Sequence, residues 1–282
     1  MIEGRPSQTA FGVARRRAVH QLWDDPKVFD DPLAVRIIGR EAAAELEQNP
    51  PADFLPSRFL RAFLAVRSRY AEDQLALAVE RGVLQYVVLG AGLDTFAYRN
   101  PFKDVRVFEV DHPATQAWKT RLLHAAKIEI PSSLHYAPVD FERETLPNGL
   151  AMAGFKKEEP AFFSWLGVTP YLERETVLST LRWIVSACPQ NGVTFDYSVP
   201  RAALAPTQQA AFDALTARVA AAGEPFISFF DPKEFVAELS AMGFGAIEDL
   251  DNKAINFRYF RERTDGLAVG GAGRLMCAGG FQ

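Results

Sequence analysis

The chain has 282 residues, 48% of them hydrophobic, and a formal net charge of -4 at pH 7. Its length suits one large domain with a substantial buried core. The weakly acidic balance argues against nucleic acid and anionic membranes as main partners, because phosphate binding needs a concentrated excess of Lys and Arg. The one tight basic cluster, Arg15-Arg16-Arg17, is expected to form a solvated helix face.

The two cysteines, Cys188 and Cys277, lie far apart in the chain and show no metal-ligand spacing. The sequence therefore predicts reduced thiols, without a disulfide framework or a metal site. No apolar run approaches the roughly 20 residues that span a bilayer, and the N-terminus is too polar for a signal peptide. A cytoplasmic protein is expected.

Residues 10–80 are predicted to be helical with breaks at prolines, and the last of these helices is expected to end at Gly82. The nearly continuous apolar run 83–89 then predicts a strand that is buried on both faces. Similar short runs predict further strands over 105–110, 136–139, 161–163, 193–195, 246–250 and 274–278.

Helices are predicted between these strands. Residues 177–185 have apolar side chains at helical spacing, and Asp231-Pro232-Lys233-Glu234 is a helix start that leads to an end at Gly243. The alternation predicts an α/β fold with a mostly parallel sheet, whose ligands bind beyond the carboxyl ends of the strands. We expect residues 1–82 and the insertion 201–230 to cover a core formed by 83–200 and 231–282.

The turn Gly90-Ala91-Gly92 follows directly after the first predicted strand. Glycine permits a sharp turn and a close ligand approach there, and we expect the next helix to begin beyond it with unpaired N–H groups. Asp111 ends the next strand, where a carboxylate can accept hydrogen bonds from both hydroxyls of a ribose. Glu109 alternates with Asp111 and is expected to face the same way. Together they predict a nucleotide-type cofactor.

The third glycine of a dinucleotide fingerprint is missing, because Gly92 is followed by Leu93-Asp94-Thr95. This omission disfavours NAD and FAD, whose pyrophosphate uses a glycine-rich helix start. A cofactor with a ribose and an adenine but no phosphate, such as S-adenosylmethionine, suits the site better.

The segments 87–95 and 108–113 resemble the leucine carboxyl methyltransferase family, especially its bacterial branch of S-adenosylmethionine-dependent methyltransferases. The resemblance extends over nearly the whole chain, through 5–10, 165–172, 195–197, 229–232 and 258–260. It implies a class I methyltransferase fold, which is a Rossmann-like seven-stranded sheet with an antiparallel last strand under a helical cover.

The same resemblance implies contacts to the cofactor. Arg67 would pair with its carboxylate, Gly90-Ala91-Gly92 would line its methionine portion, and Asp111 would hold the ribose. In the pair Asp140-Phe141, Asp140 would lie near the adenine amino group and Phe141 against the ring.

One position departs from the family pattern. Many members carry an acidic residue before the glycine of the fourth-strand motif, and this chain has Leu166 in Trp165-Leu166-Gly167. That acid would help to hold the ammonium group of the cofactor, so the chain must use backbone carbonyls or another acid there.

Methyl transfer needs alignment of donor and acceptor more than covalent chemistry by the protein. A carboxylate acceptor is already ionised and needs a cation to orient it, for which Arg99, Arg258 and the Arg15–Arg17 cluster are candidates. A hydroxyl acceptor would gain from a base, but no catalytic residue is assigned among His20, His112, His124 and His135. Tyr171 is a further candidate for lining the substrate pocket, and Phe226, Phe229 and Phe230 either line it or anchor the cover.

The leading hypothesis is therefore an O-methyltransferase that uses S-adenosylmethionine and a small, mainly apolar acceptor. One alternative is an NAD-dependent oxidoreductase. Another is a catalytically silent nucleotide-binding module, which is consistent with Leu166 at the position where many family members carry an acid. The acceptor, the choice between carboxylate and hydroxyl transfer, and the oligomeric state stay open at the level of the sequence.

Overall fold

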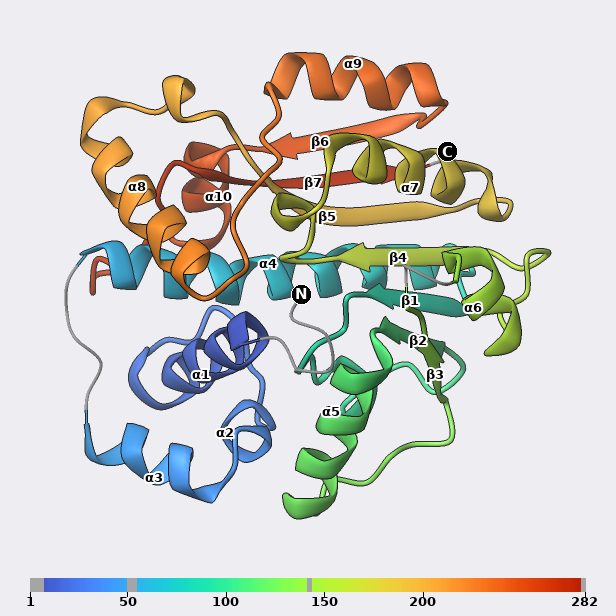
Figure 1. Ribbon diagram of the computed structural model, residues 1–282, viewed down its shortest axis with the longest axis horizontal. Coiled ribbons are helices and arrows are strands. Elements are labelled where there is room, and N and C mark those ends of the chain that lie inside the picture. The colour runs from blue at the N-terminus through green and yellow to red at the C-terminus, as the bar shows by residue number, and fades with distance from the viewer. Residues whose placement is uncertain (1–7, 50–54, 141–143, 280–282) are drawn as a thin grey trace.

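A single sheet with helices on both faces forms the centre of the molecule (Figure 1). The computed structural model describes residues 8–49, 55–140 and 144–279. The sheet has seven strands in the order β3-β2-β1-β4-β5-β7-β6. Strand β7 runs antiparallel to β5 and β6, and the other neighbours are parallel. The strands are β1 (Gln85–Leu89), β2 (Arg106–Asp111), β3 (Leu134–Pro138), β4 (Ala161–Trp165), β5 (Gly192–Ser198), β6 (Ala246–Leu250) and β7 (Gly273–Gly279).

The predicted strands are confirmed, and their apolar character follows from their burial. Every residue of β1, β4 and β5 is buried, as expected for central strands covered on both faces. The predicted ends differ most at β5, which continues beyond residue 195 through Asp196 and Ser198. These two side chains interrupt the apolar run although they are only 4% and 7% exposed.

Helices cover the two faces of the sheet separately. On one face, α6, α7 and α9 pack their apolar residues against β1, β2, β4 and β5. On the other face, α4 packs against β1 and β2, and α10 packs against the edge formed by β6 and β7. The helices are α4 (Leu55–Glu80), α5 (Pro113–Ala125), α6 (Leu146–Met152), α7 (Arg174–Ala187), α9 (Pro232–Met242) and α10 (Asn252–Tyr259).

The remaining helices form a cover at the carboxyl edge of the parallel strands. In Figure 1 the arrowheads of β4 and β6 point toward the side where α8 lies, and α1 lies below it. Apolar residues of α1, α2 and α3 form one cluster with Leu93, which follows the glycine turn, and with Leu123 of α5. The cover helices are α1 (Gln8–Trp23), α2 (Ala34–Ile37), α3 (Arg40–Gln48) and α8 (Pro206–Ala221). The cover is therefore packed on the part of the sheet where ligands bind in this architecture.

The predicted helix after Gly92 is wrong. The chain instead forms a single 3-10 turn, η1 (Phe96–Tyr98), before it enters β2. The Asp94 carboxylate accepts a hydrogen bond from the Phe96 amide at 2.8 Å, which favours a tight turn. Pro101 lacks an amide donor and disfavours helical geometry at Asn100, so too few residues remain for an α-helix.

Other predicted helix boundaries are confirmed. The Asp231 carboxylate accepts hydrogen bonds from the amides of Lys233 and Glu234 and so caps α9. Gly82 and Gly243 end α4 and α9 with positive φ angles of 93° and 104°. Within the described ranges, no helix has the length and apolarity needed to cross a membrane.

Candidate active site

The glycine turn lies at the carboxyl end of β1, where the structure requires glycine. Gly90 is exposed between buried neighbours and has a φ of +67°. A Cβ atom on Gly90 would lie 2.4 Å from Cγ2 of Val168, so a side chain is excluded. Gly92 has a φ of +46° and faces Ala10 of α1. The β4–α7 connection thus borders the turn on one side, and the cover borders it on the other.

Asp111 lies beside this turn at the end of β2. Its carboxylate accepts hydrogen bonds from the amides of Gly92 at 2.6 Å and His112 at 2.7 Å. Burial raises the pKa of Asp111, while these two amides act in the opposite direction. In the described part of the chain, no Lys or Arg side chain hydrogen-bonds to it. A carboxylate with two oxygens has lone pairs left for further donors.

Glu109 precedes Asp111 by two residues but is enclosed by α5. It forms an ion pair with Lys119, with 2.7 Å between Oε2 and Nζ, and each side chain is 1% exposed. Burial raises the pKa of Glu109 to about 7, although Lys119 favours its charged form. The phenol of Tyr98 lies 3.4 Å from the same carboxylate oxygen. Glu109 therefore holds α5 against β2.

Asp140 is brought next to Asp111 by strand pairing. β2 and β3 are parallel neighbours, and the Val139 amide donates to the Asp111 carbonyl at 2.9 Å. Asp140 thus follows β3 at the same edge of the sheet. Its predicted companion, Phe141, lies outside the described residues.

Arg67 reaches the same edge from α4. Its guanidinium pairs with Asp196 of β5, with 3.2 Å between Nη1 and Oδ2, and the side chains are 10% and 6% exposed. The guanidinium also lies across Gly167, where an added Cβ would meet Nη2 at 2.6 Å. The other oxygen of Asp196 accepts from the Gly167 amide at 2.5 Å. Arg67 and the connection after β4 are therefore held together by Asp196.

Asp196 is not among the site residues predicted from the sequence. Its signal is a lone acid inside the apolar strand 192–198, where an unpaired charge would be costly to bury. Because Gly167 follows Leu166, the Asp196 carboxylate lies beside the position where many family members carry an acid. In this chain, the carboxylate next to that position is supplied by Asp196 of β5 and not by the segment that follows β4.

Tyr171 lies between this edge and the cover, at the end of the 3-10 turn η2 (Thr169–Tyr171). Its ring packs edge-on against Phe226, with 5.0 Å between the ring centroids. Burial raises the pKa of Tyr171, while Arg67 nearby and a hydrogen bond with Thr9 of α1 lower it. Thr9 also hydrogen-bonds to Glu224, which follows α8. The start of α1 thus joins Tyr171 to the insertion.

The three phenylalanines beside the insertion take different places. Phe226 contacts Tyr171, whereas Phe229 packs against Phe212 of α8 at 5.8 Å between centroids. Phe230 is 1% exposed and stacks on Phe235 of α9. Phe229 and Phe230 therefore anchor the cover.

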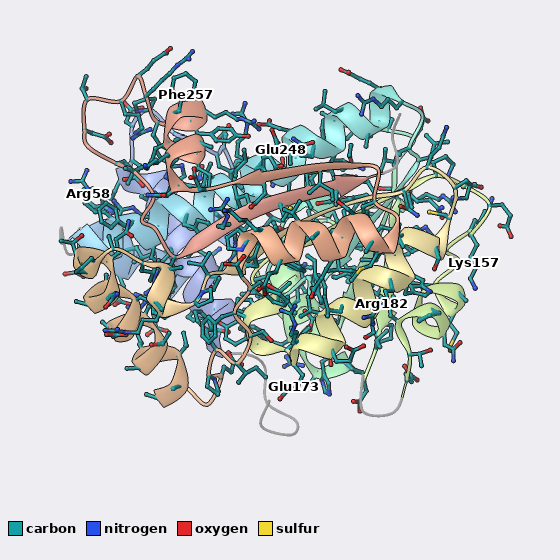
Figure 2. All side chains as sticks on the ribbon, turned by 90° about the horizontal axis from the view of Figure 1, so that it is seen from above. Arg58, Lys157, Glu173, Arg182, Glu248 and Phe257 are labelled. Carbon is teal, nitrogen blue, oxygen red and sulfur yellow. The ribbon has the colours of Figure 1, made fainter. Side chains whose placement is uncertain are left out.

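Most of the cations predicted to orient the acceptor have carboxylate partners within the protein. Arg258 of α10 pairs with Glu248 on the edge strand β6, and Glu248 is labelled in Figure 2. Arg99 pairs with Glu72 of α4. The expectation of a solvated face for Arg15–Arg17 is wrong for Arg17, which is 5% exposed and pairs with the fully buried Asp31. That expectation fails because α1 packs on the loop after the glycine turn.

Histidine contacts indicate structural roles. His20 is fully buried; its Nδ1 lies 2.7 Å from the Asp24 carboxylate, and its Nε2 accepts from the Val28 and Phe29 amides. His112 caps α5 by accepting from the Ala114 amide at 3.1 Å. His135 stacks on Phe108. None of these contacts presents a free base to the glycine turn.

Comparison with known proteins identifies the family. The model of the leucine carboxyl methyltransferase family matches residues 10–185, which include the glycine turn, Asp111 and the fourth-strand motif. The chain belongs to the leucine carboxyl methyltransferase family. The family predicted from the sequence is thereby confirmed, as are the coarser class of S-adenosylmethionine-dependent methyltransferase and the cofactor.

Relatives of this methyltransferase carry provisional names of the same class. YktD of Bacillus subtilis, provisionally named an S-adenosyl-L-methionine-dependent methyltransferase, is 32% identical over 293 residues, covering 95% of this chain and 96% of that protein. Rv3399 of Mycobacterium tuberculosis, provisionally named in the same way, is 34% identical over 174 residues, covering 58% and 49% of the two chains.

Solved structures share the fold at low sequence identity. A provisionally assigned methyltransferase from Thermobifida fusca matches with a TM-score of 0.57 and 17% identity, over 99% of this chain and 96% of that one. A DUF574 family protein from Streptomyces avermitilis matches with a TM-score of 0.54 and 16% identity, over 94% and 96%. The predicted class I fold of the methyltransferase, with its antiparallel last strand, is confirmed.

Proposed function

We propose that this methyltransferase transfers the methyl group of S-adenosylmethionine to an oxygen of a small, mainly apolar carboxylate or hydroxyl compound. The observation that carries the proposal is the juxtaposition of a turn that only glycine fits with the buried Asp111 carboxylate. Both lie under a cover whose first residues contact Tyr171. When bound, S-adenosylmethionine supplies a methyl group on a positively charged sulfur.

The residues at the edge of the sheet fit this cofactor. Asp111 would accept hydrogen bonds from the ribose hydroxyls, because among the described residues its carboxylate oxygens accept only from two backbone amides. Gly90-Ala91-Gly92 would line the methionine portion, since a Cβ on Gly90 is excluded. Asp140 would take the adenine amino group, with Phe141 against the ring.

At the other end of the site, Arg67 and Asp196 suit the carboxylate and ammonium groups of the amino-acid portion of the cofactor. Arg67 would hold the carboxylate of the cofactor. Asp196 would balance the positive charge of its ammonium group, because Leu166 occupies the position where many family members carry an acid. Asp196 is already anchored by Arg67 and by the Gly167 amide, so its orientation is fixed before the cofactor binds.

An acceptor that is already ionised suits the rest of the site. His20 and His112 are held by hydrogen bonds to backbone amides, so neither is free to take a proton from a hydroxyl. A carboxylate oxygen needs no base, and its transfer depends on alignment and on exclusion of water. The cover would provide both, with Tyr171 and Phe226 along the acceptor path. Arg258 stays a weaker candidate, because it pairs with Glu248 at the edge strand.

Calorimetric titration with S-adenosylmethionine and S-adenosylhomocysteine tests this assignment. Wild type is expected to bind both, and Asp111→Ala is expected to bind them at least about tenfold more weakly, since a charged hydrogen-bond acceptor is lost. Asp104→Ala, at an exposed carboxylate before β2, is the matched control and should bind normally. Undiminished binding by Asp111→Ala would contradict the ribose role.

A further outcome separates the remaining alternative, a catalytically silent module. Binding of S-adenosylmethionine without mass gain in any member of a broad panel of acids and alcohols would favour a silent module.

A further inference from the structure

A cavity of about 190 Å³ lies between α1, α3 and α4, within the cover. The polar side chains that line it are those of Arg15, Arg16, Arg61 and Ser57, and none of the described lining residues is acidic. Arginine and serine side chains offer hydrogen-bond donors, and each guanidinium carries a positive charge. A cavity of this volume has room for several water molecules or for one small anion.

Two of these arginines have acidic partners that do not belong to the lining. Arg61 makes a two-pronged contact with Asp24, at 2.7 and 2.8 Å. Arg15 pairs with Glu45 at 3.0 Å. Their charges are thus balanced within the protein, and the net charge at the cavity depends on Arg16.

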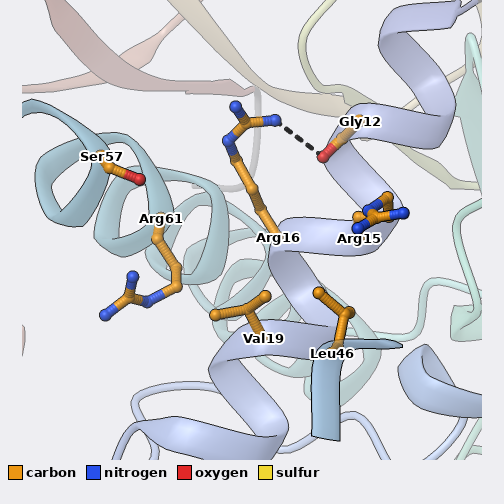
Figure 3. A pocket seen from close by; sticks show the side chains of 7 residues that line it. All are labelled: Gly12, Arg15, Arg16, Val19, Leu46, Ser57 and Arg61. Carbon is orange, nitrogen blue, oxygen red and sulfur yellow. Dashed lines mark hydrogen bonds between the residues drawn. The ribbon is translucent and has the colours of Figure 1, made fainter. Parts of the chain in front are cut away.

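Arg16 is half-buried and lacks such a partner. Its Nη1 donates to the Gly12 carbonyl at 3.0 Å, and Figure 3 shows the side chain turned back along α1. Within residues 8–49, 55–140 and 144–279, this is its one hydrogen bond, and no carboxylate forms an ion pair with it. Because a guanidinium has several N–H donors, most of them stay available to a ligand.

Gly12 leaves room for this arrangement. It lies inside α1, where glycine has a lower helix propensity than alanine. A Cβ atom on Gly12 would lie 3.4 Å from Nη1 of Arg16, which is a tight contact. The helix thus has a residue of low propensity at the position where the Arg16 guanidinium approaches its backbone.

A second unpaired arginine lies near Arg16, on the cover helix α8. Arg218 is exposed, and among the described residues no carboxylate forms an ion pair with it. Burial lowers the pKa of Arg16, and the positive charges of Arg218 and Arg15 lower it further. An anion between α1 and α8 would offset this repulsion, because it would favour the charged form of both arginines.

We infer that this part of the cover binds a phosphate dianion, free or as the phosphate of a small monoester, through Arg16 and Arg218. Guanidinium groups bind phosphate oxygens through paired hydrogen bonds, and the charge of the dianion matches the two unpaired arginines. Ser57, in the first turn of α4, lines the same cavity, and its hydroxyl can donate a further hydrogen bond. This site lies in the cover, and the inference does not depend on the proposed function.

Thermal unfolding of the whole protein at pH 8 tests the inference, because a ligand that binds only the folded state raises the unfolding midpoint. The probes are the sodium salts of phosphate, glycerol 3-phosphate, acetate and chloride at one ionic strength. Wild type is expected to bind at least one of the two phosphates about tenfold more tightly than acetate or chloride, as charge-assisted hydrogen bonds provide. The phosphate that binds more tightly shows whether the ligand is the free anion or an ester.

Three variants isolate the site. Arg16→Gln and Arg218→Gln are each expected to lower the affinity for phosphate about tenfold. Arg40→Gln is the matched control, because it removes an exposed charge at the start of α3 that does not line the cavity, and it should respond as wild type does. Phosphate also stabilises folded proteins by its exclusion from their surface, but that effect is common to all variants.

The inference is overturned if acetate and chloride raise the midpoint of wild type as much as the phosphates do, because screening of charge alone then explains the effect. It is equally overturned if Arg16→Gln or Arg218→Gln responds to phosphate as strongly as Arg40→Gln.

Discussion

Buried ion pairs position the residues of the site. Glu109 and Lys119 join β2 to α5, and Arg67 and Asp196 join α4 to β5. Burial of two charges costs desolvation energy that their attraction barely offsets, so such pairs add little stability. Removal of one partner is far more costly, because the other charge is left unpaired. Their effect is to fix where neighbouring side chains lie.

The pair Glu109–Lys119 gives a prediction for single and double variants. Lys119→Met is expected to lower the free energy of unfolding by about 3–5 kcal/mol, since it leaves a buried carboxylate unpaired. The double variant Glu109→Leu with Lys119→Met should recover most of this loss, since no charge stays buried. Urea denaturation at pH 8 measures both. A double variant as unstable as Lys119→Met would contradict the explanation.

At this scale, the sequence correctly placed Asp111 at the end of a strand, while its role toward the cofactor stays a proposal. Asp111 follows an apolar run directly, and parallel strands bring their ends together. Asp196 was missed because its importance depends on Arg67, which is 129 positions away in the sequence. The burial of Arg17 was likewise hidden, because its partners Asp31 and Thr95 come from other segments.

Among the elements, α1 and α4 are joined through a buried acid. Asp24 follows α1 and accepts hydrogen bonds from His20 and from Arg61 of α4. Although burial raises the pKa of Asp24, hydrogen bonds from His20 and Arg61 lower it to about 2. Aspartate in an unfolded chain has a pKa of about 3.9. The charged form therefore stabilises the fold above pH 4, and this contribution is lost as the pH falls toward 2.

Asp24→Asn tests this junction. The variant is expected to be about 3 kcal/mol less stable than wild type near pH 7, because Arg61 loses its carboxylate. The difference should shrink by about 1–2 kcal/mol between pH 4 and pH 2, after allowance for solvent screening. Urea denaturation of both proteins across this range measures the difference, with Asp25→Asn at the exposed neighbour as the control. A difference that is constant with pH would be the contradictory result.

Over the whole molecule, a buried polar network joins the cover to the sheet. Arg17 of α1 pairs with Asp31 and donates to the Thr95 hydroxyl at 2.7 Å, next to the glycine turn. Arg99 continues the network from Asp31 to Glu72 of α4. The cover and the cofactor edge thus share their contacts, which supports the expectation of a single domain.

Unfolding of the whole chain checks this expectation. Far-ultraviolet and near-ultraviolet circular dichroism should show one coincident transition in urea. Asp31→Asn is expected to lower the free energy of unfolding by about 3–5 kcal/mol, since Arg17 and Arg99 lose a buried carboxylate. It should also weaken S-adenosylhomocysteine binding, because the loop after the glycine turn is held by the same network. Two separate transitions in wild type would instead indicate an independent cover.

The sequence by itself determined the strands, the glycine turn, the place of Asp111 at a strand end and the methyltransferase family. These features are local, because apolar runs, strand ends and a motif of consecutive residues carry them. Only the tertiary structure decided which arginines are paired, and that the Asp196 carboxylate lies beside Leu166, at the position where many family members carry an acid. Such facts depend on distances between segments far apart in the chain, which are set by how the helices of the cover pack on the sheet.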